Sequence, residues 1–100
     1  MSAAVDLQAA GLDLDRPWRL HPRVALREES FGALAYHFGT RRLSFLKSRL
    51  LRDVVAGLER HPSARAACRQ AGVGDAELPA YTRALGALAR SGMIEPRVGA

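Results

Sequence analysis

The stretch FGALAYHFGTRRLSFLKS, residues 31–48, decides the fold of this chain. Apolar residues occupy every second position on both sides of Gly39-Thr40, which is the pattern of a half-buried β-strand. These positions are Leu34, Tyr36 and Phe38 before the break and Leu43 and Phe45 after it. Two such runs joined by a short, glycine-containing break predict a β-hairpin.

The length of the turn sets the register of this hairpin. Gly39-Thr40 suits a two-residue type II′ turn, because glycine tolerates the positive φ of the first central position. A turn of two or four residues sets Tyr36 opposite Leu43. It also sets Leu34 opposite Phe45 and gathers the apolar residues on one face, whereas a three-residue turn separates them. We therefore expect this shared face, with Leu43 and Phe45, to pack against the core.

The flanking sequence completes an α+β fold. Trp18 to Arg27 alternates in the same way and predicts a strand before the hairpin. Three helical patterns follow, from Ser48 to His61, from Ser63 to Gly72, and from Asp75 or Ala76 to Ser91, and Met93–Glu95 suits a short final strand. A three-stranded antiparallel sheet followed by three helices is winged helix-turn-helix-like.

Size and composition suit one small domain with a single core, since the chain has 100 residues. We expect the domain to span residues 16–97, after a mobile N-terminal tail of residues 1–15 that shows no sustained periodicity. Cys68 is the only cysteine, so no internal disulfide can form. The chain shows neither a secretory signal nor an apolar run long enough to span a membrane, so we expect a cytoplasmic protein.

The sequence offers little equipment for catalysis. His21, His37 and His61 stand apart from one another, and Cys68 lies in an alanine-rich segment without a second cysteine or a histidine beside it. A catalytic or metal site needs several such groups close together. We therefore predict no enzymatic activity, no catalytic or metal-binding residues and no bound cofactor.

The positive charge makes nucleic acid the alternative partner. Fifteen basic and ten acidic side chains give a net charge of +5, and without the three acids of residues 1–15 the balance is fifteen against seven, near +8. A winged helix with that charge could bind DNA through its third helix. That helix offers Arg83 and Arg90 but no Asn, Gln or Lys to contact bases. A DNA-binding transcription factor is therefore the second hypothesis, and a permanent accessory subunit of an enzyme is the third.

The last strand of the expected sheet has an edge without a neighbour. With Gly32–Phe38 in the middle, Arg42–Lys47 pairs on one side only, and it contains no proline or glycine that would hinder further pairing. Three kinds of occupant are open. The edge can be covered by Met93–Arg97 or the N-terminal strand of the same chain, by a second copy in a homodimer, or by a peptide added as one more strand.

Two segments carry a resemblance to a known family. They are WRLHPRVALREESFGALAYHFGTRRLSFLKSRLL and YTRALGALARSGMI, and their most specific parts are VALREESFGALAYHF and RRLSFLKS. From Trp18 to Ile94 the chain resembles the small peptide-binding chaperones of mycofactocin biosynthesis. These belong to the wider PqqD-like group of recognition elements for ribosomally made, modified peptides (RiPPs).

The resemblance implies a non-catalytic chaperone with neither a nucleic-acid nor a membrane partner. The precursor peptide is expected to bind as an added antiparallel strand between Arg42–Lys47 and the third helix, and to be presented to a radical S-adenosylmethionine (SAM) maturase. The iron–sulfur clusters would belong to that enzyme, because this chain has too few cysteines to hold one. The expected peptide-binding residues are Arg42, Leu43, Ser44, Phe45, Leu46, Lys47, Tyr81, Arg83, Ala84, Ala87 and Arg90.

These residues have three expected roles. The backbone of the strand residues would pair with the peptide, and the arginines and the lysine would attract acidic side chains. Ala84 and Ala87 are small enough to let the peptide approach the helix.

Overall fold

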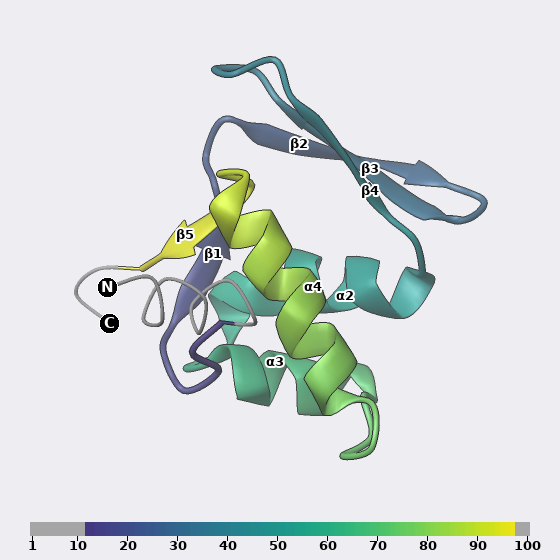
Figure 1. Ribbon diagram of the computed structural model, residues 1–100, viewed down its shortest axis with the longest axis vertical. Helices are drawn as coiled ribbons and strands as arrows, with labels where there is room; N and C mark the ends of the chain where they lie inside the picture. The colour runs from purple at the N-terminus through teal and green to yellow at the C-terminus, as the bar shows by residue number, and fades with distance from the viewer. Residues whose placement is uncertain (1–11, 98–100) are drawn as a thin grey trace, which may run out of the picture.

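The structure, a computed structural model, describes residues 12–97 (Figure 1). Its strands are β1 (Trp18–Leu20), β2 (Val24–Glu29), β3 (Gly32–His37), β4 (Leu43–Leu46) and β5 (Ile94–Pro96). Its helices are α2 (Arg49–Gly57), the 3₁₀ turn η1 (Leu58–Arg60), α3 (Ala64–Ala71) and α4 (Leu78–Arg90). β2, β3 and β4 form an antiparallel sheet, and the helices drawn in Figure 1 all lie on one side of it. The predicted fold class, a three-stranded sheet followed by three helices, is confirmed.

The hairpin of β3 and β4 has the predicted register. Tyr36 lies opposite Leu43, and Leu34 lies opposite Phe45. β3 is the middle strand, because its other edge pairs with β2 along the whole length of both strands. The alternation of apolar residues therefore predicted the pairing correctly.

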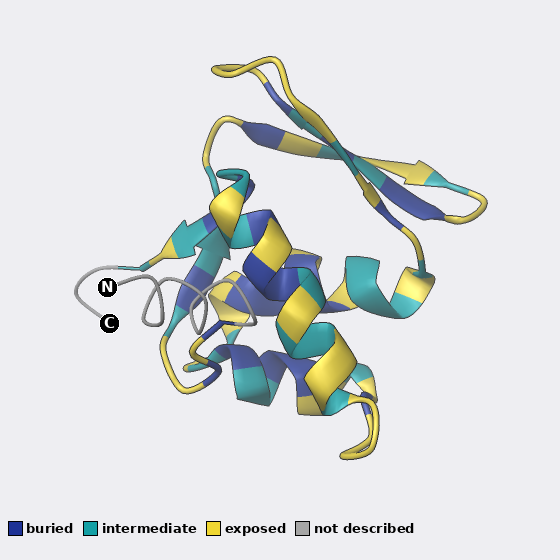
Figure 2. Ribbon diagram, viewed as in Figure 1, coloured by how far each residue is buried: buried dark blue, intermediate teal, exposed yellow. Residues whose placement is uncertain are grey.

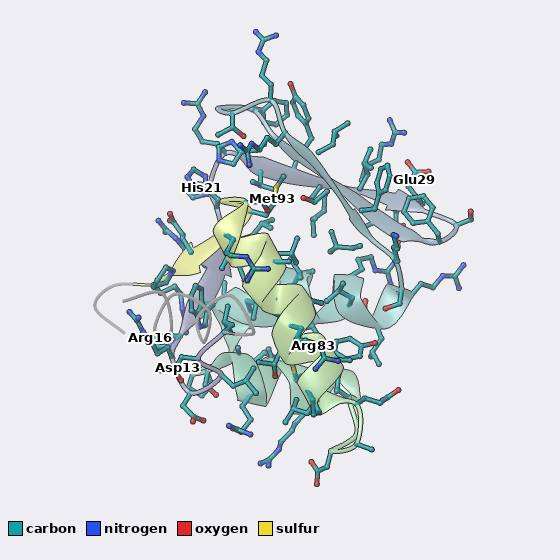
Figure 3. All side chains as sticks on the ribbon, viewed as in Figure 1. Asp13, Arg16, His21, Glu29, Arg83 and Met93 are labelled. Carbon is teal, nitrogen blue, oxygen red and sulfur yellow. The ribbon has the colours of Figure 1, made fainter. Side chains whose placement is uncertain are left out.

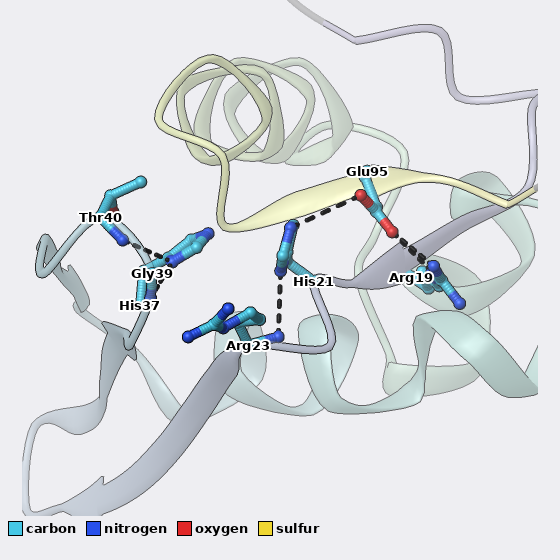
Figure 4. Close-up of polar contacts among 7 residues, drawn as sticks. All are labelled: Arg19, His21, Arg23, His37, Gly39, Thr40 and Glu95. Atoms are coloured by element: carbon cyan, nitrogen blue, oxygen red, sulfur yellow. Dashed lines mark hydrogen bonds and ion pairs between the residues drawn. The ribbon is translucent and has the colours of Figure 1, made fainter.

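The turn of the hairpin differs from the predicted type II′ turn. The loop has four residues, 38–41, and Arg41 takes the positive φ, of 63°, whereas Gly39 does not. His37 stabilises this loop, because its Nδ1 accepts hydrogen bonds from the N–H groups of Gly39 (3.0 Å) and Thr40 (3.1 Å) (Figure 4). A loop of four residues and a loop of two residues, both centred on Gly39-Thr40, pair the same residues of β3 and β4. The register was therefore predicted correctly although the predicted turn type was wrong.

The face of the hairpin that meets the core is the opposite of the predicted one. Ala33, Ala35 and Leu46 are buried, whereas Leu43 and Phe45 are 56% and 60% exposed. The small side chains of β3 let α2 pack against the sheet, and Leu46 enters the core just before α2 begins. The prediction that Leu43 and Phe45 belong to the core is therefore wrong.

The strand predicted before the hairpin is divided into two at Pro22. β1 leaves the three-stranded sheet and pairs with β5 instead. Arg19 of β1 lies opposite Glu95 of β5, and their side chains form an ion pair of 2.6 Å (Figure 4). The short final strand that the sequence predicted is thereby confirmed as β5.

Helix ends follow the predicted caps closely. The Ser48 Oγ accepts a hydrogen bond from the Leu51 N–H (2.9 Å), and Ser63 caps α3 in the same way. α3 ends at Gly72, whose φ of 106° is in the left-handed region that favours glycine. The core lies mainly among these helices and β1, and the three-stranded sheet borders it on one side (Figure 2). Its largest fully buried side chains are Leu46, Leu58, Leu85, Met93, Val54, Val55 and Cys68.

Residues 12–15 belong to the packed part of the chain, although the sequence placed them in a mobile tail. Leu12 and Leu14 are buried in the core. The Leu14 carbonyl accepts a hydrogen bond from the Arg65 N–H (2.9 Å), and the Asp15 carboxylate pairs with the Arg65 guanidinium (2.9 Å). The rest of the predicted tail, residues 1–11, lies outside the described residues. No helix described between residues 12 and 97 is long and apolar enough to cross a membrane.

Candidate functional site

β4 is an edge strand whose outer side has no strand beside it. The sheet order is β2-β3-β4, and β5 pairs with β1 rather than with β4. Both strands of this chain that could have covered the edge are therefore paired with each other. Within residues 12–97 the outer edge of β4 remains open to a further strand.

The backbone groups that point outward from this edge belong to alternate residues. The His37 N–H donates to the Arg42 carbonyl (2.9 Å), so these two residues form a hydrogen-bonded pair of the β3–β4 ladder. Such pairs alternate along an antiparallel ladder, so Ser44 and Leu46 also bond to β3. The N–H and C=O groups of the intervening residues point away from the sheet. These residues are Leu43 and Phe45.

An open groove with a volume of about 330 Å³ runs between this edge and α4. Its lining residues are Ser44, Phe45, Leu51, Ala84, Ala87, Leu88 and Ser91. The α4 residues are spaced by three or four positions, which places them on one face of the helix. Because alanine and serine dominate that face, the groove can accept a peptide backbone close to the helix.

Residues 17–95 match the peptide chaperone MftB family. The chain belongs to this family. Three curated relatives bear the name peptide chaperone MftB. Those from Mycobacterium ulcerans (strain Agy99) and Mycobacterium tuberculosis (strain ATCC 25618 / H37Rv) are 56% and 58% identical, over 89% and 85% of this chain and 82% and 78% of theirs. The relative from Mycolicibacterium smegmatis (strain ATCC 700084 / mc(2)155) is 55% identical over 84% of this chain and 82% of its own. No solved structure matches significantly.

Membership of the MftB family confirms the resemblance that the hairpin and the last helix carried. The matched residues include all three strands of the larger sheet and both walls of the groove. The family is one of peptide chaperones, so the prediction of a non-catalytic protein is also confirmed.

Four of the residues predicted to bind a peptide line the groove of this MftB-family chain, and three lining residues were not among those predicted. The four predicted residues are Ser44, Phe45, Ala84 and Ala87. Leu51 and Leu88 were missed because their helical spacing is that of core residues. Ser91 follows Ala87 by four residues, and this spacing alone could have identified it.

The other predicted residues surround the groove or lie away from it. Leu46 is fully buried, and Leu43 lies on the outer face of the sheet. The Tyr81 hydroxyl is 3.5 Å from the Ser48 Oγ, just beyond the end of β4. Arg90 lines a separate hollow beside β1. The remaining three are exposed, namely Arg42, Lys47 and Arg83, the last of which stands on α4 (Figure 3).

The lining of the groove carries no ionisable side chain. The groups with shifted pKa values lie elsewhere: burial raises the pKa of the Cys68 thiol, and the Arg65 guanidinium lowers the pKa of Asp15 by its hydrogen bond and its charge. Nor do residues 12–97 bring together three His, Cys, Asp or Glu side chains that could hold a metal ion. The groove therefore suits backbone hydrogen bonds and apolar contacts.

Proposed function

We propose that this chain is a non-catalytic chaperone that binds the mycofactocin precursor peptide as an added antiparallel strand on β4. It would present the peptide to a radical SAM maturase in the cytoplasm. One observation carries this proposal: the outward backbone groups of Leu43 and Phe45 lie beside a groove that has no charged lining. Strand addition satisfies such groups, and side-chain pockets supply the selectivity.

The alternation of β4 defines how a peptide strand would sit. Ser44 faces α4, so the peptide residue opposite Ser44 would point into the groove, towards Ala84 and Ala87. The peptide residues opposite Leu43 and Phe45 would point to the other face of the sheet. Small or apolar peptide residues at alternate positions are therefore the ones that the groove accepts.

Cations flank the edge on both sides and favour an acidic peptide. Arg42 precedes β4, Lys47 follows it, and both are exposed. Arg83 stands on the exposed side of α4. Each exposed ion pair contributes only about 0–1 kcal/mol, so these residues tune the affinity, and the backbone pairing and the groove supply most of it.

The maturase, rather than this chain, would hold the cofactors of the modification. Iron–sulfur clusters are bound by several cysteine thiolates. Cys68 is the only cysteine of the chain and is buried, so its thiol is not available to a cluster.

Titration of the isotope-labelled protein with the precursor peptide tests the proposal. The amide signals of β4 and of residues 84–91 are expected to shift, with saturation at micromolar concentration or below. Duplex DNA should leave them unchanged. Shifts confined to Arg83 and its neighbours with DNA, and none with the peptide, would favour the transcription-factor hypothesis instead.

A further inference from the structure

The outer face of the three-stranded sheet, the side away from α4, forms a second apolar surface. Its members are Phe31, Leu34, Tyr36, Phe38, Leu43 and Phe45, here named the outer face. The Phe31 and Phe45 rings contact each other with centroids 5.9 Å apart, and those of Tyr36 and Phe38 are 4.9 Å apart. Part of this surface is a hollow of about 560 Å³ between Phe31, Leu34 and Phe45. The large side chains thus form one continuous patch.

This distribution of side chains is the reverse of what core packing alone would select. Four of the six aromatic residues of the chain lie on the outer face, whereas the side chains of β3 that face the helices include Ala33 and Ala35. Phe38 is 56% exposed and Phe45 is 60% exposed. Monomeric proteins rarely expose a contiguous apolar patch of this kind unless a partner covers it.

We propose that the outer face docks a folded partner protein whose contact surface is apolar in the centre and acidic at the rim. Cations stand at both ends of the face: Lys47 lines the hollow at one end, and Arg41 lies in the hairpin loop at the other. Neither of these two belongs to an ion pair described within residues 12–97. The acid that lines the hollow is Glu29, and its carboxylate already pairs with Arg27 (2.6 Å). Figure 3 shows Glu29 on the three-stranded sheet. A complementary partner therefore supplies carboxylates.

The same charges disfavour a second copy of this chain as the occupant. Two outer faces packed together bring the unpaired cations of one rim near those of the other, with no added carboxylates between them. Like charges facing each other across an interface oppose association. A partner with acidic residues at these positions forms attractive charge interactions where a homodimer would meet repulsion.

The outer face and the groove can be occupied at the same time. β4 lies between them: Ser44 faces α4, Leu43 faces outward, and Phe45 borders both the groove and the outer hollow. One added strand extends the sheet by about 5 Å at its edge, so it leaves the side chains of Leu34 and Tyr36 uncovered. A protein on the outer face would then lie directly beside a peptide held on β4. This inference rests on the proposed function in one respect: it identifies the docked protein as the maturase that acts on that peptide.

Binding of the purified maturase to Phe38→Ser tests the proposal, because Phe38 lies in the hairpin loop and does not line the groove. The dissociation constant for the maturase is expected to rise at least tenfold, while that for the precursor peptide stays within twofold of wild type. Phe38→Leu, the matched control, retains an apolar side chain and is expected to bind the maturase nearly as wild type does.

A charge reversal tests the acidic rim separately. Lys47→Glu is expected to weaken maturase binding at least threefold at low salt, and Arg69→Glu, an exposed position on α3, is expected to leave it unchanged. Equal maturase affinity in wild type and Phe38→Ser would overturn the proposal. The proposal would also be overturned if the wild-type protein were a dimer that Phe38→Ser converts to a monomer. Binding of the wild-type protein to anionic phospholipid vesicles instead of the maturase, lost in Phe38→Ser, would overturn it as well. Absence of peptide binding in every variant would refute the proposed function alone, because maturase binding is measured without the peptide.

Discussion

Replacing Phe45 by proline isolates the backbone contribution of the open edge. The Phe45 N–H points outward from β4, so proline removes this donor without breaking the β3–β4 ladder. Proline also removes the phenyl ring, and Phe45→Ala is the matched control because it removes the ring and keeps the N–H. Ser44→Pro is the contrasting variant, since its N–H bonds to β3.

The expected magnitudes follow from where each N–H points. In the free protein the Phe45 N–H meets solvent, so Phe45→Pro and Phe45→Ala should differ in free energy of unfolding by no more than about 1 kcal/mol. Ser44→Pro leaves a carbonyl of the buried Ala35 without its donor, which costs about 1–3 kcal/mol. In the complex, the peptide carbonyl that accepts a hydrogen bond from the Phe45 N–H loses its donor in Phe45→Pro, at a similar cost. A loss of about 1–3 kcal/mol in binding free energy is roughly a 5- to 150-fold rise in the dissociation constant.

Calorimetric titration with the precursor peptide and chemical denaturation of the same three variants provide the measurements. We expect Phe45→Pro to bind the peptide about 5- to 150-fold more weakly than Phe45→Ala, with both variants equally stable. Equal peptide affinity in these two variants would mean that the peptide does not pair with this edge. A folded Ser44→Pro together with an unfolded Phe45→Pro would mean that the Phe45 N–H bonds to β3 and the Ser44 N–H points outward, the reverse of the arrangement described.

Three further perturbations test the fold around the site. Ser48→Ala should cost about 0.5–2 kcal/mol in denaturation experiments by uncapping α2, and Ser48→Asp should recover most of it; equal stability of all three proteins would exclude the cap. Gly32→Ala should destabilise more than Ser48→Ala, because the added Cβ would collide with the Leu46 carbonyl oxygen and the backbone has a φ of +148°; a fully stable variant would contradict that geometry. Arg65 holds the pKa of Asp15 below its ordinary value of 3.8, so the pair stabilises the fold above that pH and the effect is lost as the pH falls through the lowered pKa. In Arg65→Gln the pKa of Asp15, followed by NMR, should return to the ordinary value, and an unchanged pKa would show that Arg65 is not its cause.

The sequence predicts the sheet well because its signals there are local. Alternation and turn parity are enough to align Tyr36 with Leu43. The absence of proline and glycine shows only that β4 can pair on both sides, and the structure shows that β1 and β5 leave its outer edge open. The groove is harder, because it depends on where α4 lies relative to β4, and no periodicity contains that information. The family resemblance supplied it, and the positions of Ala84 and Ala87 beside Ser44 agree.

Residues outside the predicted domain were misjudged for a similar reason. Leu12 and Leu14 are isolated apolar residues among small and acidic ones, so they show no period. They are nevertheless buried, because the chain passes α3 there and the Leu14 carbonyl meets the Arg65 N–H. A contact that depends on two distant segments leaves no pattern in either one.

The wrong turn and the wrong face of the hairpin have one cause. In a strand of L-residues the side to which a side chain points is tied to the side to which its own N–H and C=O point. A two-residue loop at Gly39-Thr40 would have made Tyr36 and Leu43 a hydrogen-bonded pair, whereas the four-residue loop makes His37 and Arg42 that pair. The register is identical in both cases, but the phase of the hydrogen bonds is inverted.

Because the hydrogen-bonded and non-hydrogen-bonded pairs are exchanged, the two faces of the hairpin are exchanged as well. The aromatic set that a two-residue turn would direct to the helices faces outward, and Ala33, Ala35 and Leu46 face inward. The same inversion selects Leu43 and Phe45, rather than Ser44, as the residues whose backbone is open to a peptide. The His37 side chain, which holds the Gly39 and Thr40 amides in the longer loop, thus links the hairpin turn to both surfaces proposed to bind partners.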